Sequence, residues 1–111
     1  MLLELLNLYW RAKIIKPNVI WDENKNAINI KKHGVDFNEA ATVFNDPNIM
    51  ILFDERHSED EERFIALGYS RLTRLLTVCH CYRENDTVIR LITARKADKR
   101  ERKDYEGGNK L

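Results

Sequence analysis

Cysteine is scarce in this sequence, and its two cysteines do not indicate a disulfide framework. Cys79 and Cys81 are separated by one residue inside an apolar run, so both are expected on one face of a strand, where they cannot close a loop. A reducing, cytoplasmic compartment is therefore predicted. His80 between them alternates to the opposite face, so a Cys-His-Cys metal site is not expected. The two cysteines are interpreted as small apolar strand residues.

Long hydrophobic runs and catalytic signature motifs are also lacking. Residues 1–8 are rich in leucine, but they include Glu4, lack a basic leader and precede no small-residue cleavage site. A signal peptide is therefore not predicted, and the run is too short to cross a membrane. No GxGxxG, Walker loop, GxSxG or set of four metal ligands is present. The sequence predicts neither a cofactor nor a metal ion.

Charge is unevenly distributed along this short chain. Its 111 residues carry a formal net charge of +1 and suffice for one domain that buries about two-thirds of its unfolded surface around a single core. Residues 36–62 hold nine acidic residues and one basic residue, and residues 63–103 hold eleven basic and four acidic, which gives −8 beside +7. A chain polarised in this way can bind a polyanion on one side and a cationic partner on the other.

The first part of the chain predicts an extension, a short strand and a helix. Residues 1–18 form an N-terminal extension, either a short amphipathic helix or a flexible segment. A short strand follows at residues 19–21. Asp22 then caps a helix over residues 23–32, which ends at Gly34 in a left-handed conformation.

Two further expectations concern the helices. The first helix is expected to bury Ala27 and Ile28. A second helix begins at Asp36, where Glu39 three positions later indicates a capping box. This helix is expected to end at Asn45, just before an Asp-Pro pair.

From residue 49 onward the apolar period changes from helical to strand-like. Four strands are predicted, and their short connections favour an antiparallel meander; they span residues 49–53, 63–69, 72–82 and 87–93. An acidic loop covers residues 54–62, and a basic helix follows the last strand. Together with the two earlier helices, these elements predict an α+β fold of two layers. The expected domain covers residues 19–106, with a tail at 107–111.

The last strand and the helix after it concentrate positive charge. This segment can present a row of cations beside a sheet, an arrangement suited to phosphate; the cations are Arg90, Arg95, Lys96, Lys99, Arg100, Arg102 and Lys103.

Several motifs together resemble one protein family. They are WDENK at residues 21–25, KHGVDFNEA at 32–40 and IRLITARKA at 89–97, accompanied by Glu62-Arg63, Gly68, Glu101-Arg102 and Tyr105. In this order and spacing, residues 19–106 resemble the BrnT toxin family. The resemblance implies a type II toxin with a RelE-like fold that cleaves RNA as an endoribonuclease. It also implies a BrnA-like ribbon-helix-helix antitoxin, through which the pair would bind operator DNA and repress its own operon, with the ribosome as an optional partner.

Metal-independent RNA cleavage sets the chemistry that the residues must supply. The 2′-hydroxyl is the nucleophile, so the protein provides proton transfer and charge stabilisation. Histidine suits the first role and arginine the second. The expected catalytic residues are His33, His57, Arg63, Arg90 and Arg95. The expected RNA-binding residues are Lys32, Lys96, Lys99, Arg100 and Tyr105.

Each candidate has a structural alternative. His33 can serve only the helix dipole, and His57 can be a solvated loop residue. Arg63 and Arg90 can pair with local carboxylates such as Glu61 or Glu62. Lys99 and Arg100 can belong to a solvated helix face, and Tyr105 can be a packing residue.

The function as a whole also has an alternative, a non-catalytic module that binds a partner and assembles a repressor. An independent DNA-binding domain is disfavoured, because the second helix is short and acidic.

Overall fold

The computed structural model describes residues 18–108 of the chain. The expected N-terminal helix or flexible segment at residues 1–17 lies outside the described residues, as does the end of the tail. The elements are β1 (Asn18–Ile20), α2 (Glu23–His33), α3 (Phe37–Ala40), the 3-10 helix η1 (Ala41–Asn45), β2 (Met50–Phe53), the 3-10 turn η2 (Glu55–His57), β3 (Phe64–Tyr69), β4 (Leu75–Arg83), β5 (Val88–Lys96) and α4 (Lys99–Gly108).

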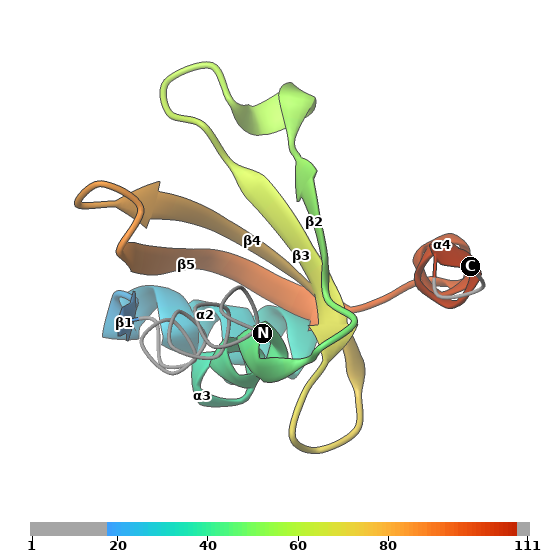
Figure 1. The fold of residues 1–111 in the computed structure, drawn as a ribbon. Coiled ribbons are helices and arrows are strands. Elements are labelled where there is room, and N and C mark those ends of the chain that lie inside the picture. Colours follow the sequence, from blue (N-terminus) through green and yellow to red (C-terminus); the bar gives the residue numbers. More distant parts are fainter. Residues whose placement is uncertain (1–17, 109–111) are drawn as a thin grey trace, which may run out of the picture.

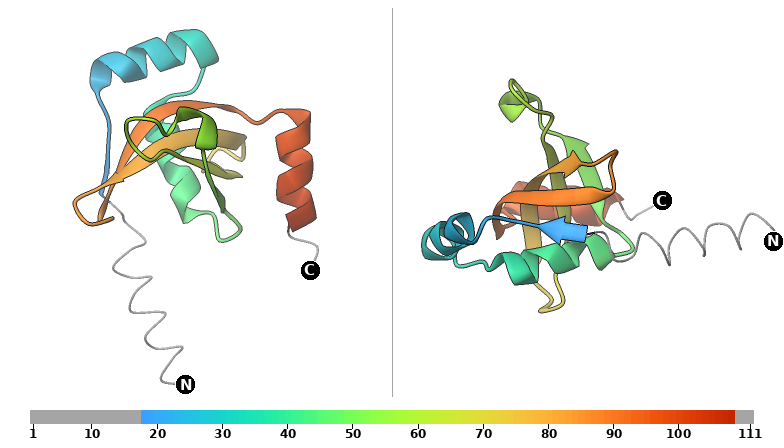
Figure 2. Two further views of the ribbon diagram at one scale, coloured as in Figure 1. Left: turned by 90° about the horizontal axis from the view of Figure 1, so that it is seen from above. Right: turned by 90° about the vertical axis from the view of Figure 1, so that its left-hand side faces the viewer.

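The strands form one mixed five-stranded sheet in the order β1-β5-β4-β3-β2. The antiparallel meander from β2 to β5 is confirmed, and β1 adds to β5 in parallel, beside it in Figure 2. The third predicted strand begins later than expected, at Leu75, because residues 70–74 form a turn in which Ser70 N donates to Arg74 O at 2.9 Å. The predicted α+β class is therefore confirmed.

One face of the sheet is covered by α3 and η1, whereas α2 lies along the edge that β5 forms. In Figure 1, α2 and α3 lie on the same side of β5. Alternation along the strands places every second side chain on this face. In β5 the register shifts once, at Ile92, so the core residues of this strand are Ile89, Leu91 and Ala94. The main core is built from Val35, Phe37, Ala40 and Val43 of the helical segment and Ala66, Leu76, Val78, Ile89, Leu91 and Ala94 of the strands. This face therefore supplies the core, and the opposite face is left for other roles.

Helix α2 buries different residues from those predicted. Ile28 is 64% exposed and Ala27 is exposed, whereas Asn26 and Asn29 are buried. Asn29 lies against the part of β5 that β1 does not reach: its Nδ2 donates to Ala94 O at 2.8 Å and its Oδ1 accepts from Ala94 N at 3.0 Å. The expected apolar face is wrong, because α2 meets the edge of the sheet, where unpaired backbone groups require polar partners.

The predicted cap of the second helix is confirmed, but the reciprocal half of the capping box is wrong. Asp36 accepts from Asn38 N at 2.8 Å. Glu39 turns away from the helix start into a buried site, where it accepts from Arg74 Nε at 2.8 Å and from Ser70 Oγ at 2.7 Å. The hydrogen bond from Arg74 holds the pKa of Glu39 below its ordinary value, against the effect of burial. Glu39 therefore ties α3 to the β3–β4 turn.

Helix α4 packs on the opposite face, at one end of the sheet and away from α2 and α3 (Figures 1 and 2). Tyr105 is the anchor: its ring packs with Leu67 and Leu75 and meets Tyr69 edge-on at 5.3 Å. Its hydroxyl donates to Asp46 Oδ2 at 2.7 Å. Because α4 covers only this end, the rest of the face stays open.

Among residues 18–108, no helix is long and apolar enough to cross a membrane.

Candidate functional site

The open face carries a cleft of about 220 Å³ beside the end that α4 covers. The register places Thr77 opposite Arg95 and Cys79 opposite both Ile65 and Thr93. These side chains face away from the core because they alternate with buried core residues along their strands. The lining comprises Asp54, His57, Arg63, Ile65, Thr77, Cys79, Ile92, Thr93 and Arg95. Three of the expected catalytic residues, His57, Arg63 and Arg95, thus share one cleft.

A histidine–carboxylate pair stands at the side of this cleft. His57 Nδ1 lies 3.0 Å from Asp54 Oδ2, and the two residues are three positions apart across the η2 turn. Asp54 is buried, whereas the His57 side chain is 62% exposed. Asp54 is fixed by its own backbone, since its N–H donates to Arg63 O at 2.9 Å. When His57 carries its proton on Nδ1 toward Asp54, Nε2 is free to accept a proton from a substrate.

Two guanidinium groups line the same cleft. Arg63 directly precedes β3, and its Nε is buried without a hydrogen bond among the described residues. Arg95 on β5 donates to both oxygens of Glu101, at 2.8 and 2.9 Å. This pair raises the pKa of Arg95. Burial alone would raise the pKa of Glu101, but the bonds from Arg95 and the Asp98 backbone outweigh it, and the pKa is lowered. Both groups therefore stay charged at neutral pH.

The cysteine positions agree with the predicted alternation. Cys79 lines the cleft, and His80 is fully buried on the core face, where its ring lies 5.0 Å from Phe44. Burial raises the pKa of the Cys79 thiol to about 11. Cys79 is therefore neutral at neutral pH and does not act as a thiolate nucleophile. Among residues 18–108, no three histidine, cysteine or acidic side chains are grouped to hold a metal ion.

Arg90 lies on the open face but outside the cleft lining. Its Nη2 is 3.6 Å from Glu61 Oε1, and Arg63 Nε is 3.8 Å from the same oxygen. Arg83 donates to Glu61 Oε2 at 2.7 Å. Arg63 and Arg90 therefore both contact Glu61, as the structural alternative for these two residues expected.

The remaining expected residues lie elsewhere. His33 and Lys32 are in the last turn of α2, and neither lines the cleft. Lys96, Lys99 and Arg100 are exposed and also lie outside the lining. Tyr105 is only 5% exposed, so its place in the core agrees with the packing alternative and not with RNA stacking.

Sequence reasoning missed Asp54, Glu101 and the central place of Glu61. The spacing of Asp54 and His57 was a usable signal, because one helical turn brings side chains three positions apart together. No local signal marks Glu61 as the shared partner of three arginines. That arrangement depends on the path of the loop and on the strand register.

The fold and the cleft define a class of small α+β proteins with a cationic, histidine-containing cleft on an open sheet face. Residues 21–101 match a family described as the ribonuclease toxin, BrnT, of type II toxin-antitoxin systems. The match covers most of the chain, so the chain belongs to the BrnT family of ribonuclease toxins.

The structure is similar to that of a solved relative. The 1.1 Å crystal structure of the Brucella abortus ribonuclease toxin BrnT aligns with a TM-score of 0.58 and 24% sequence identity, over 74% of this chain and 97% of that one. At this identity the likeness concerns the fold. A search of curated proteins gave no match.

Proposed function

We propose that this toxin is an endoribonuclease whose active site is the cleft on the open face of the sheet. The observation that carries the proposal is the pairing of His57 with Asp54 at a cleft that also contains Arg63 and Arg95. A base with a fixed partner and two cations are the groups that RNA cleavage without a metal ion requires. The family supports ribonuclease activity as such.

In the proposed reaction, His57 Nε2 takes the proton of the 2′-hydroxyl, and the oxygen attacks the adjacent phosphorus. Asp54 holds the ring and stabilises the imidazolium that forms, at the 3.0 Å distance seen here. Arg63 and Arg95 bind the non-bridging phosphate oxygens, whose charge grows in the phosphorane. The bond to the 5′-oxygen then breaks, this oxygen takes a proton from solvent, and a 2′,3′-cyclic phosphate remains.

Glu101 has a positioning role in this scheme. It receives two hydrogen bonds from Arg95 and is fixed by a bond from Asp98 N at 2.9 Å. The pair restricts the guanidinium to one orientation beside Thr77, so less side-chain entropy is lost when phosphate binds. Glu101 also connects the cleft to α4.

Cleavage of a defined RNA by the purified, antitoxin-free chain tests the proposal. We expect His57→Gln to lower the cleavage rate by about 10²–10⁴-fold and Arg63→Ala by about 10²-fold. The matched control is His33→Gln, which lies outside the cleft and should cleave at the wild-type rate. A 2′,3′-cyclic phosphate product and full activity in EDTA would support the metal-independent route. Equal loss in His57→Gln and His33→Gln would contradict the site.

The partners follow from the same proposal. We infer a BrnA-like ribbon-helix-helix antitoxin that neutralises the toxin in the cytoplasm and carries the pair to operator DNA for autoregulation. A type II toxin-antitoxin family supports an antitoxin partner. The RelE-like relationship is supported by the antiparallel β2–β5 meander with helices on its core face. The alternative function is the non-catalytic module of a repressor complex. It would be favoured if the folded protein binds the antitoxin but cleaves no RNA, with or without ribosomes.

A further inference from the structure

Three arginines surround the carboxylate of Glu61 on the open face of the sheet. Arg83 Nη2 donates to Oε2 at 2.7 Å, whereas Arg90 Nη2 and Arg63 Nε lie 3.6 and 3.8 Å from Oε1. The three cations come from the last residue of β4, from β5 and from the position before β3. We call these four residues the Glu61 cluster.

The Glu61 carboxylate accepts hydrogen bonds from only part of the guanidinium donors in this cluster. Only the bond from Arg83 has hydrogen-bond length, because separations of 3.6 and 3.8 Å are too long for a direct bond. Arg63 Nε is buried and has no hydrogen-bond partner among residues 18–108. One carboxylate faces three guanidinium groups, which leaves N–H donors for a further anion. A phosphodiester offers two non-bridging oxygens in a geometry that guanidinium groups bind well.

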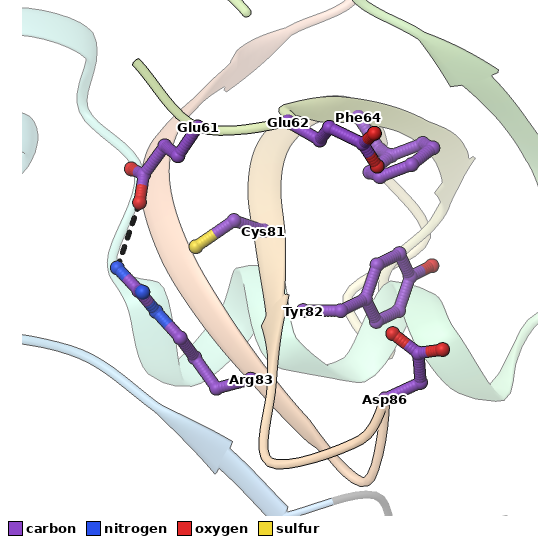
Figure 3. Close-up of a pocket in the computed structure, with 7 residues that line it drawn as sticks. All are labelled: Glu61, Glu62, Phe64, Cys81, Tyr82, Arg83 and Asp86. Carbon is purple, nitrogen blue, oxygen red and sulfur yellow. Dashed lines mark hydrogen bonds and ion pairs between the residues drawn. The ribbon is translucent and has the colours of Figure 1, made fainter.

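The Glu61 cluster lies beside the cleft along continuous hollow surface. His57 and Arg63 line both the cleft and a second hollow, which Glu61 also lines. Glu61 in turn lines a third pocket of about 440 Å³. Figure 3 shows the residues that line this pocket, with Glu61 joined to Arg83 on one side of β4 and the rings of Phe64 and Tyr82 on the other side of that strand. These rings lie 5.1 Å apart. An RNA strand that leaves the cleft past Arg63 therefore meets Glu61 next.

We propose that Arg63, Arg83 and Arg90 form a second phosphate-binding site of the RNA path, which Glu61 occupies in the free protein and leaves when RNA binds. The proposal rests on the proposed ribonuclease function and adds to it a binding residue, Arg83, and an internal competitor. The phosphate is the neighbour of the one that is cleaved. Its charge replaces that of Glu61, so the cluster exchanges one anion for another.

The loop allows Glu61 to leave without unfolding. The Glu61 side chain is 26% exposed, and its residue lies outside the helices and strands. The base of the loop is closed by Ser58, whose Oγ accepts from Arg63 N at 3.0 Å and whose side chain also donates to the Asp54 backbone. A rotation of the Glu61 side chain is therefore sufficient, and Asp54 and His57 keep their places.

Binding of a non-cleavable RNA tests the site separately from the chemistry. The probe is a fluorescently labelled, fully 2′-O-methylated RNA oligonucleotide, which lacks the nucleophile. Fluorescence anisotropy gives its affinity for the full-length, antitoxin-free chain at several salt concentrations. Glu61→Gln is compared with Glu55→Gln, which removes the same charge from the same loop outside the cluster. Arg83→Ala is compared with Arg71→Ala in the β3–β4 turn, and circular dichroism verifies each fold.

We expect Glu61→Gln to bind the probe about three- to fivefold more tightly than Glu55→Gln. Arg83→Ala should bind more weakly than Arg71→Ala and show a salt slope smaller by about 0.7, as for one lost phosphate contact on single-stranded RNA. The gain from Glu61→Gln should disappear in the Arg83→Ala background, since the two changes act on one site.

Three outcomes overturn the proposal in distinguishable ways. If each variant matches its charge control while the wild type binds and cleaves RNA, the second phosphate site fails and the proposed function stands. If the wild type neither binds the probe nor cleaves RNA, the proposed function fails as well. If Glu61→Gln tightens antitoxin binding but not RNA binding, the ligand of the cluster is an acidic peptide of the partner.

Discussion

Asn29 on α2 and Ala94 on β5 are paired as neighbouring strand residues would be. The amide of Asn29 donates to Ala94 O and accepts from Ala94 N, and it also donates to Val35 O at 2.9 Å. The side chain thereby pairs with the backbone N–H and C=O of β5 beyond the end of β1. One buried asparagine closes the sheet edge and holds the start of α3 to it.

Replacement of Asn29 by alanine should therefore destabilise the fold. The change leaves the N–H and C=O of Ala94 and the carbonyl of Val35 without their partner, in a buried place. We expect a loss of about 2–3 kcal/mol in the free energy of unfolding. Urea unfolding followed by circular dichroism measures this loss. Asn24→Ala on the exposed side of α2 is the control, and an equally small change in both variants would contradict the role of Asn29.

Arg74 should be required for the stability of the fold, because it neutralises the buried carboxylate of Glu39. Arg74→Met removes the cation that donates to both carboxylate oxygens and leaves an uncompensated charge, so we expect a loss of about 3 kcal/mol in the free energy of unfolding. Arg71→Met in the same turn should change stability by less than about 0.5 kcal/mol. Adding Glu39→Gln to Arg74→Met should recover part of the loss, and no recovery would argue against the buried charge as its cause.

His80 should make stability depend on pH. Burial lowers the pKa of His80 from its ordinary value, so the unfolded chain binds a proton first as the pH falls. The contribution is fully present above the unfolded pKa near 6.5 and is lost as the pH decreases toward the folded pKa. We expect His80→Gln to flatten the slope below pH 6.5 by up to about 1.4 kcal/mol per pH unit. Urea unfolding between pH 7.5 and 5 measures it, and a slope in His80→Gln equal to that of the wild type would contradict the role of His80.

A growth assay distinguishes the ribonuclease from the non-catalytic binding module. Expression of this chain is induced in cells without the antitoxin, and growth is measured. At matched soluble expression, wild type should arrest growth, Arg63→Ala should relieve the arrest, and Arg90→Ala should relieve it less, because Arg90 lies outside the cleft. The relief by Arg63→Ala corresponds to about a 10²-fold loss in cleavage. Lys99→Glu with Arg100→Glu should keep the arrest if the protein is a nuclease. Weakened antitoxin binding by this pair, with no arrest by wild type, would favour the module.

The strands and helix ends could be predicted from the sequence because their signals are local. Alternation of apolar residues gave the meander, and Asp22, Gly34 and Asp36 gave the caps, since each depends on neighbours within one turn. The side that α2 buries could not be predicted in this way. The pattern favours Ile28, whereas the free edge of β5 selects Asn29.

The cleft could be predicted only in part for a related reason. Arg63, His57 and Arg95 were found by residue type, because their chemistry suits phosphate. Their partners are carboxylates whose positions depend on the sheet register and on the path of the loop. Glu101 reaches Arg95 only because the chain turns after β5, and Glu61 meets arginines at the end of β4, within β5 and just before β3.

The turn η2 gives the cleft two independently built halves. The proposed base and its carboxylate come from one turn of an irregular loop, whereas Arg95 and Thr77 belong to paired central strands. Insertions and deletions are tolerated in such loops far more readily than in strands. If the proposed roles hold, related toxins can exchange or lose the proposed proton-transfer half in evolution while the proposed phosphate-binding half persists, and affinity for RNA can then be inherited separately from the ability to cut it.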